Sequence, residues 1–87
     1  MKTIWKFNLM LTDSQRIEMP KGAEILTAQV QDRIPRLWVL IPVEEVCETE
    51  MRTILIHGTG NPIDETPQKY IGTFQESIFV WHVFEQL

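Results

Sequence analysis

The segment 57–62, HGTGNP, holds residue types that could bind a ligand. Its two alternate glycines would let the backbone approach a ligand closely and present N–H groups to an anion. Thr59 and Asn61 add side-chain donors, and His57 lies at the end of the strand that leads into the segment. The same pattern is typical of a wide turn in which both glycines adopt positive φ angles. The segment therefore predicts either a turn or a ligand loop.

A second candidate is the segment 70–75, YIGTFQ, which places a glycine inside a predicted strand. Glycine at such a position usually accompanies a bulge, or a close approach by another backbone or a ligand. Thr73 adds a hydroxyl donor beside Gly72. The large aromatic residues are interpreted as core first and as a ligand platform second; they include Trp5, Trp38, Phe79, Trp81 and Phe84.

Residues suited to catalysis or metal binding are scarce. Cys47 has Glu45 and Glu48 close in sequence, and their like charge disfavours a reactive thiolate. Cys47, His57 and His82 lack the close pairwise spacing of zinc ligands. Neither of the glycine-rich phosphate-binding motifs, G-x-x-x-x-G-K-[ST] or G-x-G-x-x-G, is present. The sequence predicts no enzyme, no metal site and no cofactor.

The charge balance limits the partners. Eight Lys and Arg against twelve Asp and Glu give a net charge of −4, and the basic residues are scattered. A binder of duplex nucleic acid usually carries a concentrated basic face, so neither such a partner nor an anionic membrane is expected. A small anionic ligand stays possible, because a pocket can be locally positive. The acidic residues Glu44, Glu45, Glu48 and Glu50 are interpreted as a solvated loop or strand edge, with docking on a basic partner as the alternative.

The composition, 44% hydrophobic and 23% charged, is typical of one soluble globular domain over residues 1–87. The longest apolar run, 37–43, is too short to span a membrane. No small-residue cleavage site follows the basic and apolar N-terminus, so no signal peptide is expected. A single cysteine fits a reducing cytosol.

Short β-branched and aromatic runs, divided by turn residues, predict an all-β fold. We expect a small antiparallel sandwich or partly open barrel of six to seven strands. A helical turn within 43–50 or 62–68 is the alternative at those places. The expected strands are 2–9, 15–19, 25–31, 36–41, 51–57, 69–75 and 78–85.

Three expectations concern how these strands are arranged. The first two strands are expected to pair as a hairpin. In the third strand, Leu26, Ala28 and Val30 are expected on one face. The strands 36–41 and 51–57 are apolar on both faces, which predicts a central position in a sheet or a covering partner.

Several segments, in this order and spacing, resemble a family of short bacteriophage and prophage proteins. The resemblance covers almost the whole chain and implies a phage protein that acts in the cytoplasm of a bacterial host. It assigns no catalytic residues, and Asn61 stands where the family often has His. The segments that carry it are 1–7, 19–23 (MPKGA), 37–38 (LW), 58–63 (GTGNPI), 70–75 (YIGTFQ) and 79–85 (FVWHVFE).

Phage origin favours a protein that acts by binding. We expect a non-enzymatic anti-defence sponge, which sequesters a small anionic, nucleotide-type ligand made by host immune signalling. Such a site needs amide and cationic groups for phosphate and an aromatic ring for the base. The candidate ligand-binding residues are Lys21, Arg33, Arg36, Trp38, His57, Gly58, Thr59, Gly60, Asn61 and Thr73.

Two other functions stay open at this stage. One is a phage inhibitor or adaptor that binds a host or defence protein, through the acidic segment or an exposed strand edge. The other is a small virion or assembly component. The strands with two apolar faces, around Trp38 and Ile54, also predict a homo-oligomer.

Overall fold

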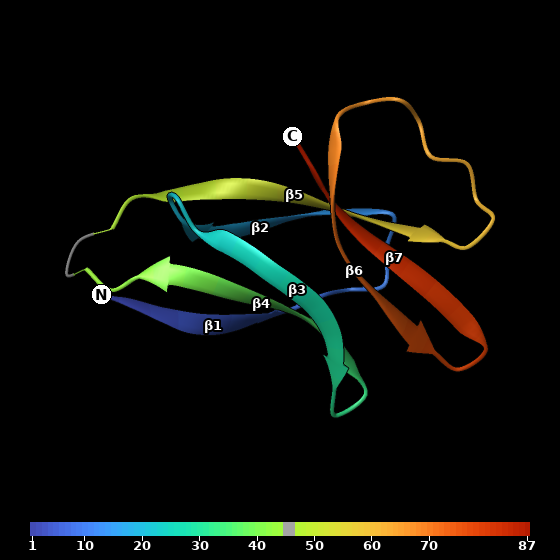
Figure 1. The fold of residues 1–87 in the computed structure, drawn as a ribbon, viewed down its shortest axis with the longest axis horizontal. Helices are drawn as coiled ribbons and strands as arrows, with labels where there is room; N and C mark the ends of the chain where they lie inside the picture. Colours follow the sequence, from blue (N-terminus) through green and yellow to red (C-terminus); the bar gives the residue numbers. More distant parts are fainter. Residues whose placement is uncertain (45–46) are drawn as a thin grey trace.

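Each of the seven predicted segments forms a strand in the computed structural model, which describes residues 1–44 and 47–87. Strand ends differ from the expected ones by at most two residues. No helix occurs in the described ranges, so no helical turn forms within 62–68, while the expectation for 43–50 lies partly outside them. The strands are β1 (Lys2–Asn8), β2 (Ser14–Pro20), β3 (Glu24–Gln31), β4 (Ile34–Pro42), β5 (Thr49–Gly58), β6 (Gln68–Glu76) and β7 (Phe79–Gln86) (Figure 1).

The strands form two antiparallel sheets that pack as a sandwich and do not close into a barrel. Sheet A has the order β1-β4-β3, and sheet B has the order β2-β5-β7-β6. The two strands with apolar residues on both faces, β4 and β5, are central in their sheets, as predicted. No helix in the described part of the chain is long and apolar enough to cross a membrane.

The expected hairpin between β1 and β2 is wrong, because the two strands belong to different sheets. β1 pairs with β4, and β2 pairs with β5. The connection passes through Leu9, which is buried in the core and whose N–H donates to the Pro35 carbonyl at 2.8 Å. At the far end of the connection, the Asp13 carbonyl accepts from the Ile56 N–H of sheet B at 3.1 Å. Burial of Leu9 thus carries the chain across the sandwich.

The core lies between the sheets and consists of the inward residues of both central strands. The buried residues alternate along each of these strands, as a strand requires: Leu37, Val39 and Ile41 in β4, and Ile54 and Ile56 in β5. Inward residues of the edge strands and of β7 complete this core between the sheets. The buried hydrophobic residues are Leu9, Met19, Ala23, Ala28, Leu37, Val39, Ile41, Ile54, Ile56, Phe74 and Val83.

A bulge in β3 corrects the expected face of that strand. The pairing with β4 shifts register between Ile25 and Thr27, so Leu26 is an extra residue. Leu26 is therefore 41% exposed, whereas Ile25 packs against the core and Ala28 is buried. The expectation that Leu26 shares a face with Ala28 was wrong, because a bulge reverses the alternation.

A second bulge, at Ile71 in β6, brings sheet B into contact with sheet A. β3 and β6 belong to different sheets and lie against each other along one side of the sandwich. At their closest approach, a Cβ atom on Gly72 would lie 3.0 Å from both the N and the O of Ala28. The glycine in segment 70–75 therefore marks a close approach by another backbone, one of the two alternatives that the sequence predicted.

An ion pair between Arg52 and Glu85 joins the first half of β5 to the end of β7. The Arg52 guanidinium donates to both carboxylate oxygens of Glu85, with Nη2 to Oε1 at 2.9 Å. Its Nη1 also donates to the Ala23 carbonyl at 2.9 Å and to Glu50 at 3.2 Å. The hydrogen bonds that Arg52 donates to Glu85 raise the pKa of Arg52 above its ordinary value. One guanidinium thus joins β5, β7 and the connection between β2 and β3.

We predict that Gly72→Ala destabilises the fold, because the new methyl group would meet backbone atoms that cannot rotate away. Glycine in a strand interior usually costs about 0.5–1 kcal/mol relative to alanine, so the ordinary expectation is a gain. Overpacking should reverse the sign and cost about 1–3 kcal/mol. Thermal unfolding measures this, with Gln75→Ala in the same strand as the control. An unchanged or raised Tm for Gly72→Ala would contradict the close approach.

We predict that Glu85→Gln costs about 2–3 kcal/mol, because it removes the less exposed of the two carboxylates that pair with a partly buried guanidinium and leaves only Glu50. The matched control is Lys21→Gln, which removes the exposed pair of Lys21 with Glu48 at 3.7 Å. Exposed pairs contribute about 0–1 kcal/mol, so this control should hardly change stability. Urea unfolding of both variants compares the two pairs. Equal losses would mean that the Arg52 pair is no more important than a surface one.

Candidate functional site

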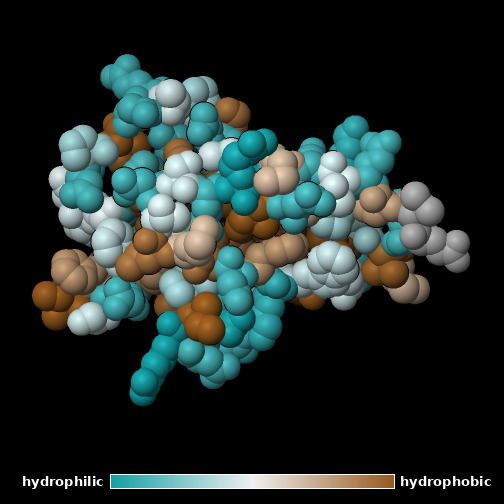
Figure 2. All heavy atoms as spheres, turned by 180° about the vertical axis from the view of Figure 1, so that it is seen from behind, coloured by the Kyte–Doolittle hydropathy of each residue, from teal (hydrophilic) through white to brown (hydrophobic). Residues whose placement is uncertain are grey.

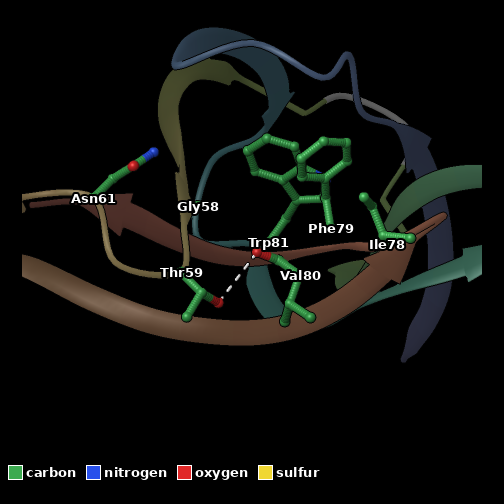
Figure 3. Close-up of a pocket in the computed structure, with 7 residues that line it drawn as sticks. All are labelled: Gly58, Thr59, Asn61, Ile78, Phe79, Val80 and Trp81. Atoms are coloured by element: carbon green, nitrogen blue, oxygen red, sulfur yellow. Dashed lines mark hydrogen bonds between the residues drawn. The ribbon is translucent and has the colours of Figure 1, made fainter.

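A hollow of about 480 Å³ lies between the end of β5 and the start of β7 (Figure 3). We call it the aromatic hollow. One wall is the loop that follows β5, and the other is the β6–β7 turn with the first residues of β7. Its lining residues are Gly58, Thr59, Asn61, Ile78, Phe79, Val80 and Trp81.

The loop wall is a tight turn over residues 58–61. The Asn61 N–H donates to the Gly58 carbonyl at 3.0 Å, and Gly60 has a φ of 88°. This is the third turn position, where a type II turn requires glycine or asparagine. The Thr59 N–H donates to the Val80 carbonyl at 3.2 Å and so attaches the loop to β7. The segment forms a turn, but a tight one and not the wide turn that was expected, and two of the N–H groups that an anion nest would use already have carbonyl partners.

Gly58 is needed for space and not for a positive φ, so that part of the expectation was wrong. A Cβ atom here would lie 2.9 Å from Asn61 Nδ2 and 3.1 Å from Trp81 Cζ3. The pairing of β5 with β7 sets Gly58 directly opposite Trp81. The missing side chain therefore admits both the indole ring and the Asn61 carboxamide at the edge of the hollow.

Two aromatic rings line the β7 side of the hollow. Phe79 and Trp81 lie on the same face of β7, with ring centroids 5.8 Å apart and planes at 34°. Trp81 packs against the core, whereas Phe79 is 54% exposed. In Figure 3 the rings lie side by side, and the Asn61 side chain points toward their end of the hollow. A planar group could stack on the exposed Phe79 ring.

From the sequence, Phe79 and Trp81 are expected in the core first and on a ligand platform second. Trp81 packs against the core in part, and both rings line the hollow, so the place of Phe79 in the site was missed. The available signal was the F-x-W spacing, which puts two rings on one face of a strand. That this face meets the 58–61 turn depends on the register of β5 with β7, which no local pattern specifies.

Thr59 connects the hollow to a row of polar side chains on the outer face of sheet B. His82 Nε2 lies 2.7 Å from Thr59 Oγ1, and His82 Nδ1 lies 3.0 Å from Thr73 Oγ1. Thr73 Oγ1 in turn lies 2.6 Å from the Tyr70 hydroxyl. The candidate residue Thr73 therefore serves this row and lies on the other face of the sheet from Trp81.

His57 holds the loop that follows the turn. Its Nε2 lies 2.9 Å from Gln68 Oε1, and Gln68 also contacts Asp64. Asp64 accepts from the Thr66 N–H at 2.9 Å and from the Thr66 hydroxyl. Both bonds lower the pKa of Asp64 below its ordinary value, and the bond from the Thr66 hydroxyl has the larger effect. His57 thus supports the loop and does not line the hollow.

The remaining candidate residues lie away from the hollow. Lys21 pairs with Glu48, and Arg36 bonds Asn8 and the Gln31 carbonyl on the outer face of sheet A. Trp38 lies on that outer face too, with the Lys6 ammonium 5.9 Å from its ring centroid.

Arg33 lies in the β3–β4 turn with a φ of 67°. It lines a separate small hollow with Glu76 and Ser77. None of the lining residues of the aromatic hollow carries a charge. Across residues 1–44 and 47–87, no cluster of three or more His, Cys, Asp or Glu could hold a metal ion.

The comparisons with known proteins give a family and no function. The chain belongs to the family described as Domain of unknown function (DUF7352), whose model matches residues 1–87. No curated protein and no solved structure gives a significant match.

We predict that Gly58→Ala folds with a smaller loss of Tm than Gly72→Ala, yet changes the aromatic hollow. Its methyl group would meet the end of a flexible carboxamide and an indole edge, both of which can move a few tenths of an ångström, whereas Gly72 faces backbone. Two-dimensional NMR checks this through the Trp81 indole and Asn61 carboxamide signals, which should shift. Unshifted signals together with a large loss of Tm would contradict the geometry.

Proposed function

We propose that this protein binds a small nucleotide-type ligand in the aromatic hollow and sequesters it without catalysing a reaction. The observation that carries the proposal is the exposed Phe79 ring beside Trp81, facing the Asn61 carboxamide across a concave surface. A stacking ring together with a donor and acceptor group is the arrangement that proteins use to hold a nucleobase.

The size and polarity of the hollow are consistent with this ligand class. Small-molecule sites usually occupy about 300–1,000 Å³ and combine apolar walls with a few polar groups. The aromatic hollow, at about 480 Å³, falls within that range and offers Ile78 and two rings with the carboxamide of Asn61. The turn and the hydrogen bonds of Thr59 fix its walls before a ligand arrives, which reduces the entropy cost of binding.

The biological setting of the proposal comes from the sequence. The resemblance to short bacteriophage and prophage proteins suggests an anti-defence sponge in the cytoplasm of an infected bacterium. A sponge needs only a binding site, and its ligand would be a nucleotide-type messenger of the host defence. The proposed homo-oligomer would use the outer face of sheet A, where Ile4 is 56% exposed beside Lys6 and Trp38.

A second candidate function, binding of a host or defence protein, is favoured by one observation. Ile78 is 84% exposed at the tip of the β6–β7 hairpin, directly beside Phe79. Figure 2 shows hydrophobic atoms gathered at the end of the molecule where this hairpin turns. A protein partner could cover this tip in place of a small ligand.

We predict that one compound from a panel of nucleotides, cyclic oligonucleotides and ADP-ribose derivatives raises Tm by several degrees. A ligand at 100 times its Kd stabilises by about 2.7 kcal/mol. Phe79→Ala should weaken its binding about tenfold or more, because stacking on an aromatic ring contributes about 1–3 kcal/mol per base.

Trp5→Ala is the matched control, since Trp5 is also about half exposed but lies in β1, away from the hollow. This variant should bind as the parent does. A panel that leaves Tm unchanged would overturn the proposal and favour a protein partner, to be sought by pull-down from infected cells. Equal losses in both variants would exclude the aromatic hollow as the site.

A further inference from the structure

We propose that the aromatic hollow reads the base of its ligand, of the adenine type, through the Asn61 carboxamide, and leaves the phosphate groups in solvent. This inference rests on the proposed function and names the part of the ligand that is recognised. It replaces the expected phosphate nest by a neutral site for a base.

The first step is the absence of groups for phosphate at the hollow. None of its lining residues is charged. The N–H groups of Thr59 and Asn61 already donate to the carbonyls of Val80 and Gly58. Tight phosphate sites use cations or several free N–H groups. A phosphate that used these two N–H groups would therefore have to break the hydrogen bonds that form the turn.

The second step concerns the one nearby cation among the candidates. Arg33 lies beyond the β6–β7 turn, in a hollow lined by Val30, Gln75, Glu76 and Ser77. The carboxylate of Glu76 shares that hollow, so its charge opposes an anion beside Arg33. The aromatic hollow lies on the other part of the same hairpin, at residues 78–81. Arg33 therefore supplies no dedicated phosphate site.

The third step is the availability of Asn61. The side-chain hydrogen bonds of the turn pass through the Thr59 hydroxyl, which contacts His82 and the Val80 carbonyl. Asn61 is exposed, and its carboxamide points toward the rings (Figure 3). A carboxamide offers one donor and one acceptor in a plane, which match N6–H and N7 of adenine.

The fourth step joins the two halves of the site. A base that stacks on Phe79 lies parallel to the ring and can turn its edge toward the Asn61 wall. Gly58 keeps the carboxamide and the indole ring close, because no Cβ separates them. Stacking then supplies affinity, and the carboxamide supplies the choice of base.

Isothermal titration of the whole chain with adenosine, AMP and 7-deazaadenosine, at low and moderate salt, tests the inference. Adenosine and AMP should bind within about threefold of each other, with little dependence on salt, because no ion pair forms. 7-Deazaadenosine stacks equally well but lacks the N7 acceptor, so it should bind about tenfold more weakly.

Two variants locate the effect. Asn61→Ala should bind adenosine and 7-deazaadenosine equally, whereas Asn8→Ala, which changes an asparagine on the outer face of sheet A, should keep the difference. If AMP binds at least tenfold more tightly than adenosine, and its affinity falls as salt is added, the inference is overturned while the proposed function survives. A difference for 7-deazaadenosine that persists in Asn61→Ala would also overturn it. A failure of all three compounds and of the wider nucleotide panel would overturn the proposed function itself.

Discussion

The Arg52 guanidinium is the constraint on which the rest of the sandwich depends. It is charged and only partly exposed, so it must find anionic and carbonyl partners inside the fold. The carboxylate of Glu85 and the carbonyl of Ala23 meet that need from two further segments. The ion pair at one end of β5 and β7, together with the inward residues between, sets a register that brings Gly58 opposite Trp81 at the other end. A slip of one residue would turn every side chain of a strand to the other face and close the hollow.

Two glycines allow close packing in this fold because they have no side chain. Gly72 lets the backbone of β6 approach that of Ala28, so the two sheets meet along one side of the sandwich. Gly58 leaves space for an indole ring and a carboxamide, so a concave surface remains where a side chain would otherwise lie. The close approach at Gly72 stabilises the fold, and the space left at Gly58 creates the candidate site. The conformational freedom of glycine is used at Gly60, where the turn needs a positive φ.

The sequence predicted the strands well because the alternation of apolar and polar residues is a local property. The two apolar faces of β4 and β5 predicted a central position or a covering partner, and both strands are central. For Gly72 the sequence predicted a bulge or a close approach by a backbone or a ligand, and a backbone approaches it. That β1 and β2 belong to different sheets could not be predicted, because the burial of Leu9 between the sheets depends on contacts distant in sequence. The candidate site was found only on its loop side for the same reason. Cations dispersed along a chain, such as Lys21 and Arg36, give no sign of whether folding brings them together.

We propose that the surface between residues 58–61 and 78–81 is a site for a base. The most direct measurement is a ¹H–¹⁵N NMR titration of the labelled chain with AMP, which follows backbone, carboxamide and indole signals together. We predict that the Trp81 indole N–H, the Asn61 carboxamide and the backbone signals of those two segments shift and saturate with one Kd. Shifts that gather instead around Arg36 and Trp38 on the outer face of sheet A, or none at millimolar AMP, would contradict the account.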